Sequence, residues 1–349
     1  MQTPRIDTVR LSDDGSALVI IDQTLLPGEL KYLSLTKTED IWEAIRALRV
    51  RGAPAIGVAA GFGAYLAAKH APAGEAERSF YAACDYLATS RPTAVNLFYA
   101  LERMRAAMGR LSGRPEGEIV AGLRAEAQAI MDDDLEMSRR MGEHGRALIK
   151  PGMGILTHCN AGALATSGLG CGLAPVYAAL DAGVEGLRLY CDETRPLLQG
   201  ARLTAFEGMA LGLDTTLLCD NMASSLMKEG KVDIIIVGCD RVAANGDTAN
   251  KIGTSGVAIL AKHYGVPFYV CGPSSSIDMA LKSGAEIPIE HRAPEEVTEL
   301  WYAQRMAPAG VKVYNPAFDV TDAALIAGII TEHGIARAPF EEDFRRWGL

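Results

Sequence analysis

Polar residues gather behind four apolar runs in the second half of the sequence. The runs are MGILTH (153–158), LRLYCD (187–192), TTLLCD (215–220) and VDIIIVGCD (232–240). A connector between structural elements needs only one or two turn residues. The segments that follow these runs instead carry a thiol, carboxylates, arginines, amides and a lysine. Such side chains can transfer protons and bind an anion, so the pattern predicts an active site there.

Two of these residues are candidates for proton transfer. Cys159 lies between His158 and Asn160, and AGALAT beyond it predicts a helix whose N-terminus would make the thiol reactive. Asp240 directly follows VDIIIVGC, where a poorly solvated carboxyl would be suited to donating a proton. Structural roles stay open: Cys159 as a core thiol, His158 as a hydrogen-bonding residue, and Asp240 as a cap or as the partner of Arg241.

Three further positions could bind phosphate. Arg51 and Gly52 lead into Pro54, a favoured first residue of a helix, and arginine can hold phosphate with two hydrogen bonds. Asn250 and Lys251 precede a helix expected from about residue 254, where backbone N–H groups and a cation suit an anion. An ordinary solvated loop is the alternative there. Arg91, before Pro92, is undecided on its own.

The elements that would position these residues differ between the two halves. In the second half, apolar runs, which also include 267–272 and 311–316, alternate with helices near 201–212, 221–229 and 254–264. This alternation predicts a parallel sheet covered on both faces. Ligands bind such sheets beyond the carboxyl ends of the strands, where the strand order reverses.

The first half predicts a small antiparallel hairpin and several helices. Strands are expected at 17–22 and 30–35, followed by a helix from Thr36 with a capping box to Glu39. Further helices are expected at 53–68, 75–88 and 94–109. A long charged helical stretch, 116–149, includes an acidic run that predicts a solvated face: Asp132, Asp133 and Asp134.

Composition narrows the functional classes. The chain has 349 residues and a formal net charge of −9, which argues against a binder of nucleic acids or of anionic membranes. Seven cysteines without CxxC pairs or zinc spacing indicate a reduced, cytoplasmic protein with no structural metal. No apolar signal segment begins the chain. A nicotinamide dehydrogenase is disfavoured, because GLGCG (168–172) lacks the third glycine of the dinucleotide fingerprint and follows no predicted strand.

Several long motifs together resemble a known family. RGAPAIG (51–57), THCNAGALAT (157–166), DETRPLLQGARLTAFE (192–207), DNMASSLM (220–227) and VGCDRVAANGDTANKIGT (237–254) are similar to those of the methylthioribose-1-phosphate isomerases of methionine salvage. That family is related to the regulatory subunits of the translation initiation exchange factor. The resemblance covers nearly the whole chain, to YNPAFDVT (314–321).

The resemblance implies roles for individual residues. Cys159 and Asp240 match the family's catalytic pair. Residues matching its substrate-binding positions are Arg51, Gly52, Ala53, Arg91, Gln199, Asn250 and Lys251. Met222, where the family commonly has alanine, is a departure that leaves the fine substrate preference open.

The family also implies an α/β architecture and an activity. A smaller, mainly helical N-terminal domain with a short antiparallel sheet (1–128) would be joined by a helical connector (129–149) to a Rossmann-like catalytic domain (150–349). The expected protein is a cytoplasmic homodimer that isomerises a small phosphorylated sugar without metal or cofactor. Alternatives are an isomerase of 5-deoxyribose 1-phosphate or ribose 1,5-bisphosphate, and a non-catalytic metabolite-binding regulator.

Overall fold

The computed structural model describes residues 5–92 and 94–349, which form two compact units. The N-terminal unit comprises residues 5–137 and 162–170 (its residue 93 is not described), and the C-terminal unit comprises 138–161 and 171–349. Helices and strands occur in both units, so the protein has the mixed α/β fold that the sequence predicts. Among the described residues, no helix combines the length and the apolar character that crossing a membrane requires.

The division between the units falls inside one helix, α5 (Glu116–Arg146). This helix confirms the long helical stretch expected from residue 116. The division lies between Met137 and Ser138, and the segment Gly162–Gly170 belongs to the N-terminal unit. The predicted domain limits, with a connector at 129–149, stay a prediction.

The N-terminal unit contains a three-stranded antiparallel sheet. The strands β1 (Val9–Leu11), β2 (Leu18–Ile21) and β3 (Tyr32–Leu35) pair in the order β1-β2-β3. The predicted hairpin is confirmed, because Leu18 pairs with Leu35 and Ile21 with Tyr32. Every residue of β2 is buried, whereas β3 at the edge of the sheet alternates between exposed and partly buried residues.

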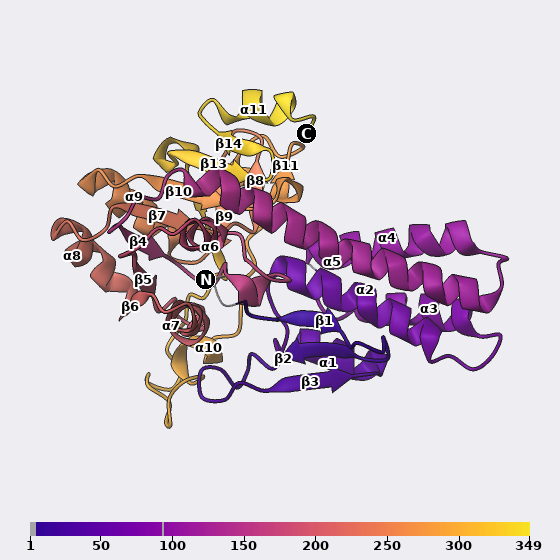
Figure 1. The fold of residues 1–349 in the computed structure, drawn as a ribbon. Coiled ribbons are helices and arrows are strands. Elements are labelled where there is room, and N and C mark those ends of the chain that lie inside the picture. The colour runs from indigo at the N-terminus through magenta and orange to yellow at the C-terminus, as the bar shows by residue number, and fades with distance from the viewer. Residues whose placement is uncertain (1–4, 93) are drawn as a thin grey trace. The chain divides into compact units, whose positions relative to one another are not determined.

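Helices form the rest of this unit. They are α1 (Thr38–Arg46), α2 (Ala53–Lys69), α3 (Ala76–Ala88) and α4 (Val95–Leu111). Figure 1 shows α2, α3 and α4 side by side, and α2 also contacts α1. The predicted capping box of α1 is wrong: the helix begins two residues after Thr36, and its N-cap residue Lys37 makes no side-chain capping bond.

A seven-stranded sheet forms the centre of the C-terminal unit. Its strand order is β14-β13-β10-β7-β4-β5-β6, and all neighbours are parallel except β13 and β14. The strands are β4 (Gly154–Thr157), β5 (Arg188–Asp192), β6 (Asp214–Leu218), β7 (Ile234–Val237), β10 (Phe268–Cys271), β13 (Gly328–Thr331) and β14 (Gly334–Ala336). The chain proceeds from β4 through β5 to β6 and then crosses to β7 on the other side of β4. The strand order therefore reverses at β4.

Helices α8, α9 and α11 share a core with this sheet. Leu156 and Ile235 of the sheet belong to one buried cluster with Met227 of α8, Val257 of α9 and Phe344 of α11. The helices that alternate with the strands are α6 (Ala174–Asp181), α7 (Ala205–Ala210), α8 (Ala223–Lys228), α9 (Thr254–Tyr264), α10 (Glu295–Thr298) and α11 (Phe340–Arg346).

A second, four-stranded sheet has the order β11-β8-β9-β12. Its strands are β8 (Arg241–Ala243), β9 (Thr248–Lys251), β11 (Ile277–Asp278) and β12 (Phe318–Thr321). The expected strand at 311–316 is wrong, because that segment forms only a single bridge, between Pro316 and His291. Val311 and Tyr314 in it are exposed, so its apolar residues do not enter a sheet.

Candidate active site

Cys159 lies two residues beyond β4, the strand at which the strand order reverses, and its backbone is strained. Its φ is 66°, in the left-handed region that side chains other than glycine rarely adopt. Its N–H donates to Thr194 Oγ1 at 2.8 Å, and its carbonyl accepts from Thr204 Oγ1 at 2.6 Å. The residue is buried. Strain of about 1–3 kcal/mol persists only where the surroundings enforce it, as these two hydroxyls do here.

Thr194 is held in the same conformation, with a φ of 64°. For a β-branched residue this is a clear outlier. The two carboxylate oxygens of Asp220 accept the N–H groups of Thr194 and Arg195, both at 2.7 Å. The Thr194 hydroxyl also donates to the carbonyl of Asp192 at 3.1 Å. A chain of hydrogen bonds therefore connects the loops after β4, β5 and β6.

The expected helix immediately beyond Cys159 is wrong. Only a three-residue 3-10 turn, Ala163–Ala165, follows, and the next α-helix, α6, begins at Ala174. Gly162 and Thr166 in AGALAT are poor helix formers, and the side chain of Asn160 is committed to Thr204 and Glu207, at 3.2 and 2.7 Å. A helix N-terminus therefore does not supply the reactivity that was predicted for the thiol.

Asp240 lies three residues beyond β7, which is the hydrogen-bonded neighbour of β4. The structure thus brings the predicted pair, Cys159 and Asp240, to adjacent strand ends. The prediction that the Asp240 carboxyl is poorly solvated is wrong in this structure, since the residue is exposed. The reason is geometric: the chain has already left the sheet at Gly238. Arg241 pairs with Asp278, at 3.3 Å.

Asn250 and Lys251 end strand β9 and are buried, so they do not form a solvated loop. The N–H of Asp240 donates to the carbonyl of Ala249 at 2.9 Å, which connects β9 to the Asp240 segment. Asn250 Nδ2 donates to Thr254 Oγ1 at 3.1 Å. Lys251 Nζ lies 4.0 Å from the ring centroid of Phe318, within range of a cation–π interaction.

The predicted backbone anion site at the start of α9 is wrong, because a carboxylate of the protein already occupies it. Asp319 accepts the N–H groups of Gly253, at 2.8 Å, and of Ser255, at 3.2 Å. It also accepts the hydroxyl of Ser255, at 2.9 Å. Any anion that binds near Lys251 must therefore use the side chains there and not the N-terminus of α9.

Gln199 is buried and immediately precedes a π-helical turn, Gly200–Thr204. Its Oε1 is buried and has no hydrogen-bond partner among the described residues. A buried acceptor without a partner is costly, and a hydroxyl of a bound ligand would satisfy it. This geometry agrees with the substrate-binding role predicted for Gln199.

The remaining predicted residues belong to the N-terminal unit. Gly52 is the N-cap of α2, with a φ of 94°, and a Cβ there would lie 2.3 Å from the carbonyl oxygen of Ala165. Only glycine fits so close to that backbone. Arg51 and Arg91 are partly buried, and the side chain of Ala53 lies outside the described part.

One buried cluster in the C-terminal unit has the composition of a metal site. Among the described residues, His158, Asp192 and Asp220 bring possible ligand atoms within 4.8 Å of one another. Both oxygens of Asp220 already accept backbone N–H groups, and both ring nitrogens of His158 are hydrogen-bonded. The side chains of His158, Asp192 and Asp220 therefore form a hydrogen-bond network with one another's segments.

The sequence did not reveal Asp192, Thr194 and Thr204 as supports of Cys159. These residues lie in the polar run 192–207, and no spacing distinguishes residues that hold a backbone from residues that contact a ligand. The only signal was the density of polar residues behind a buried strand.

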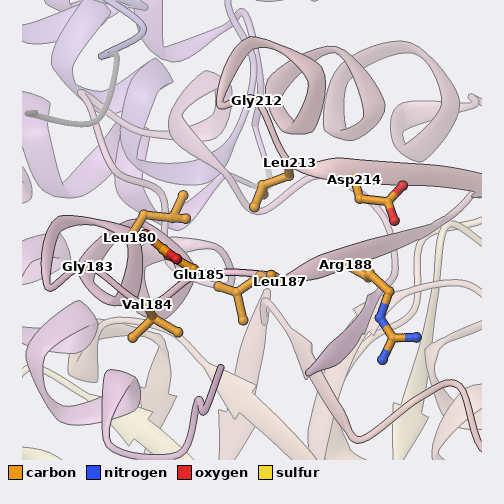
Figure 2. A pocket seen from close by; sticks show the side chains of 10 residues that line it. Leu180, Gly183, Val184, Glu185, Leu187, Arg188, Gly212, Leu213 and Asp214 are labelled. Atoms are coloured by element: carbon orange, nitrogen blue, oxygen red, sulfur yellow. The ribbon is translucent and has the colours of Figure 1, made fainter. Parts of the chain in front are cut away.

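A hollow of about 560 Å³ lies at the amino ends of strands β5 and β6 of the seven-stranded sheet. Figure 2 shows Arg188 and Asp214, the first residues of β5 and β6, beside Leu187 and Leu213. β5 spans five residues, so its first and last residues lie about 13 Å apart at ~3.3 Å per residue. This hollow is therefore separate from the polar loops around Cys159.

Comparisons with known proteins agree on one family. Residues 49–338 match the model of the initiation factor 2 subunit family. The methylthioribose-1-phosphate isomerase of Symbiobacterium thermophilum is 62% identical over 344 residues, which cover 98% of this chain and 96% of that protein. The 5-deoxyribose 1-phosphate isomerase of Petrotoga mobilis is 55% identical over 341 residues, covering 97% and 98%. The crystal structure of 5-methylthioribose 1-phosphate isomerase from Pyrococcus horikoshii OT3 superposes with a TM-score of 0.92 and 46% identity, covering 99% of this chain and 95% of that one.

Proposed function

Because the chain belongs to the initiation factor 2 subunit family, and within it to the sugar 1-phosphate isomerases, we propose that it converts 5-methylthioribose 1-phosphate into 5-methylthioribulose 1-phosphate. The reaction changes an aldose into a ketose and belongs to methionine salvage. The observation that carries this proposal is that Cys159 and Asp240 lie two and three residues beyond the carboxyl ends of the adjacent strands β4 and β7. We also propose that the C-terminal unit has a Rossmann-like fold.

The substrate poses a specific chemical problem. A phosphate on the anomeric oxygen locks the sugar ring, so the free aldehyde is unavailable and the ring must open with the phosphate attached. We propose that Asp240 donates a proton to the ring oxygen, which breaks the bond between that oxygen and C1. Its exposure in this structure means that a bound substrate must supply much of the exclusion of water around the carboxyl.

Cys159 then takes part in moving hydrogen from C2 to C1. As a base, it would remove the C2 proton to give an enediol and return a proton to C1, while the C2 hydroxyl loses its proton and becomes the ketone. That proton replaces the one that Asp240 gave to the ring oxygen. In the alternative route a hydride moves directly from C2 to C1, and Cys159 would only stabilise the reacting sugar. Both routes are balanced within the sugar and need no metal or organic cofactor. Its backbone, held at both ends by hydroxyls, keeps the thiol in one place for either route.

The phosphate and hydroxyl groups of the substrate need their own ligands. We propose that Arg51, Arg91 and Lys251 hold the phosphate and that Gly52 and Ala53 allow the backbone to approach it. Gln199 and Asn250 would bind hydroxyl groups. The buried Oε1 of Gln199 and the buried positions of Asn250 and Lys251 support this assignment. We also propose that the protein acts as a cytoplasmic homodimer, and the absence of disulfides among the cysteines of the described residues agrees with a reducing compartment.

A second candidate function is isomerisation of 5-deoxyribose 1-phosphate. The Petrotoga mobilis relative, 55% identical, has that name. The two sugars differ only at C5, where one carries a methylthio group. None of the proposed phosphate or hydroxyl ligands distinguishes them, so one site could accept both.

Proton NMR of the purified protein, without added metal or cofactor, tests these functions. Methylthioribose 1-phosphate and 5-deoxyribose 1-phosphate are supplied in parallel, and the signals of the ketose products are followed. Conversion of the first sugar supports the main proposal, and the ratio of the two rates measures how much the 5-substituent matters. Folded protein that converts neither sugar would overturn the proposal in favour of a regulatory, metabolite-binding role.

A further inference from the structure

His158 is fully buried, and both of its ring nitrogens face hydrogen-bond acceptors. Nε2 lies 2.8 Å from the carbonyl oxygen of Ile252, and Nδ1 lies 3.1 Å from Oδ2 of Asp192. The side chains of His158 and Asp192 are 1% and 0% exposed. A backbone carbonyl can only accept a hydrogen bond, so Nε2 must carry a proton.

The contact with Asp192 requires a second proton. If Nε2–H were the only proton in the pair, the lone pair of Nδ1 would face a carboxylate lone pair at 3.1 Å, which is repulsive. Burial alone lowers the pKa of the His158 ring. The hydrogen bond to Asp192 and the negative charges of Asp192 and Asp220 outweigh burial, so the pKa of His158 is raised. The pKa of the Asp192 carboxyl is raised as well, chiefly by burial and also by the charges of Asp220 and Glu193, whereas the hydrogen bond and charge of His158 lower it.

The ring's partners connect three segments of the candidate site. His158 directly precedes Cys159, Ile252 directly follows Lys251, and Asp192 ends strand β5. The fit around the ring is close: a Cβ on Gly253 would lie 2.8 Å from Cε1 and 2.9 Å from Nε2 of His158. Gly253 has a φ of 104°, so both the ring and the backbone conformation require glycine there.

We propose that His158 is a buried, doubly protonated ring that acts as a positioning residue, holding the end of strand β9 against the loop that carries Cys159. The ring anchors itself on the Asp192 carboxylate and fixes the Ile252 carbonyl, and with it Asn250 and Lys251. In this arrangement the ring does not exchange protons with the substrate. The part of the proposal that concerns catalysis rests on the proposed function, whereas the protonation of the ring does not.

The first test measures protonation directly. In protein labelled with ¹⁵N-histidine, the ring signals of His158 are identified by their absence from His158→Gln. We expect both nitrogens of His158 to be protonated at pH 7, and Nδ1 to lose its proton in Asp192→Asn, which lacks the charge. A wild-type ring with one bare nitrogen at pH 7 would overturn the proposal, and so would a stoichiometric metal ion found by elemental analysis.

The second test measures positioning. His158→Ala should lower kcat/KM by about 100-fold, with an increase in KM because Asn250 and Lys251 lose their support. His158→Gln retains an N–H donor that can reach the Ile252 carbonyl, so about tenfold of that loss should be recovered. Equal losses in both variants, with folding verified by urea unfolding, would contradict the tether. Inactive wild-type protein with both protonated nitrogens would instead point to failure of the proposed function alone.

Discussion

The buried carboxyl of Asp134 provides a sharp test of the energetics of the N-terminal unit. Asp134 lies in α5 and is only 5% exposed, and it accepts the N–H of Ser167 at 2.6 Å. Burial raises its pKa from 3.8 to about 6, although the hydrogen bonds from Ser167 oppose the change. The prediction of a solvated acidic face is therefore wrong for Asp134 but holds for its exposed neighbours Asp132 and Asp133.

The consequence for stability has a definite sign. The folded state binds the proton of Asp134 more tightly than the unfolded state, so its contribution to stability increases as the pH falls through about 6 and is lost as the pH rises. The rise of the pKa from 3.8 to about 6 corresponds to a stability contribution of about 3 kcal/mol at a pH well below both values. Between pH 7.5 and pH 5, the folded state should gain about 1.4 kcal/mol from this group.

Asp134→Asn removes the charge and retains an oxygen that can accept the Ser167 N–H. The free energy of unfolding of this variant and of the wild type is measured with urea at pH 5 and at pH 7.5. The difference, variant minus wild type, should be about 1.4 kcal/mol more positive at pH 7.5 than at pH 5, because only the wild type gains stability as the pH falls. Asp132→Asn is the matched control, because Asp132 is exposed and hydrogen-bonds only Gln128 among the described residues. It measures what the same substitution costs where the carboxyl is exposed. A pH-independent difference for Asp134→Asn would refute the raised pKa.

Three further predictions concern the site and its support. Asp240→Asn should lower kcat by at least about 10³-fold in the NMR assay while leaving the urea unfolding curve unchanged; near-normal turnover would remove Asp240 from the role of acid. Cys159→Ser should lower kcat by at least about 100-fold, since a hydroxyl is a much weaker acid than a thiol and supplies far less of the anion that would act as a base near neutral pH; full activity would return Cys159 to the role of a core thiol. Gly52→Ala should cost at least about 2 kcal/mol more than Gly74→Ala, because both glycines have positive φ but only at Gly52 would the new Cβ collide with backbone, that of Ala165. Equal midpoints of unfolding for these two alanine variants would show that the collision is relieved.

Much of the architecture could be predicted because local patterns dictate it. Continuous apolar runs are typical of a sheet covered on both faces, and five of the six predicted runs form strands of the seven-stranded sheet. The run 311–316 has the same apolar character but remains at the surface, and β13 takes the place in the sheet beside β10. Which of two short apolar segments enters a sheet depends on tertiary pairing, which periodicity does not encode.

For the candidate site, the sequence by itself determined which reactive groups follow the strands: the thiol of Cys159, the carboxyl of Asp240, and the polar loops behind four strands. Only the tertiary structure decided how they are supported. The left-handed backbone of Cys159, the hydroxyls of Thr194 and Thr204, and the buried ring of His158 depend on contacts between residues 35 to 94 positions apart. Hydrogen bonds over such separations arise from the order of the strands in the sheet, and that order is a property of the folded chain as a whole.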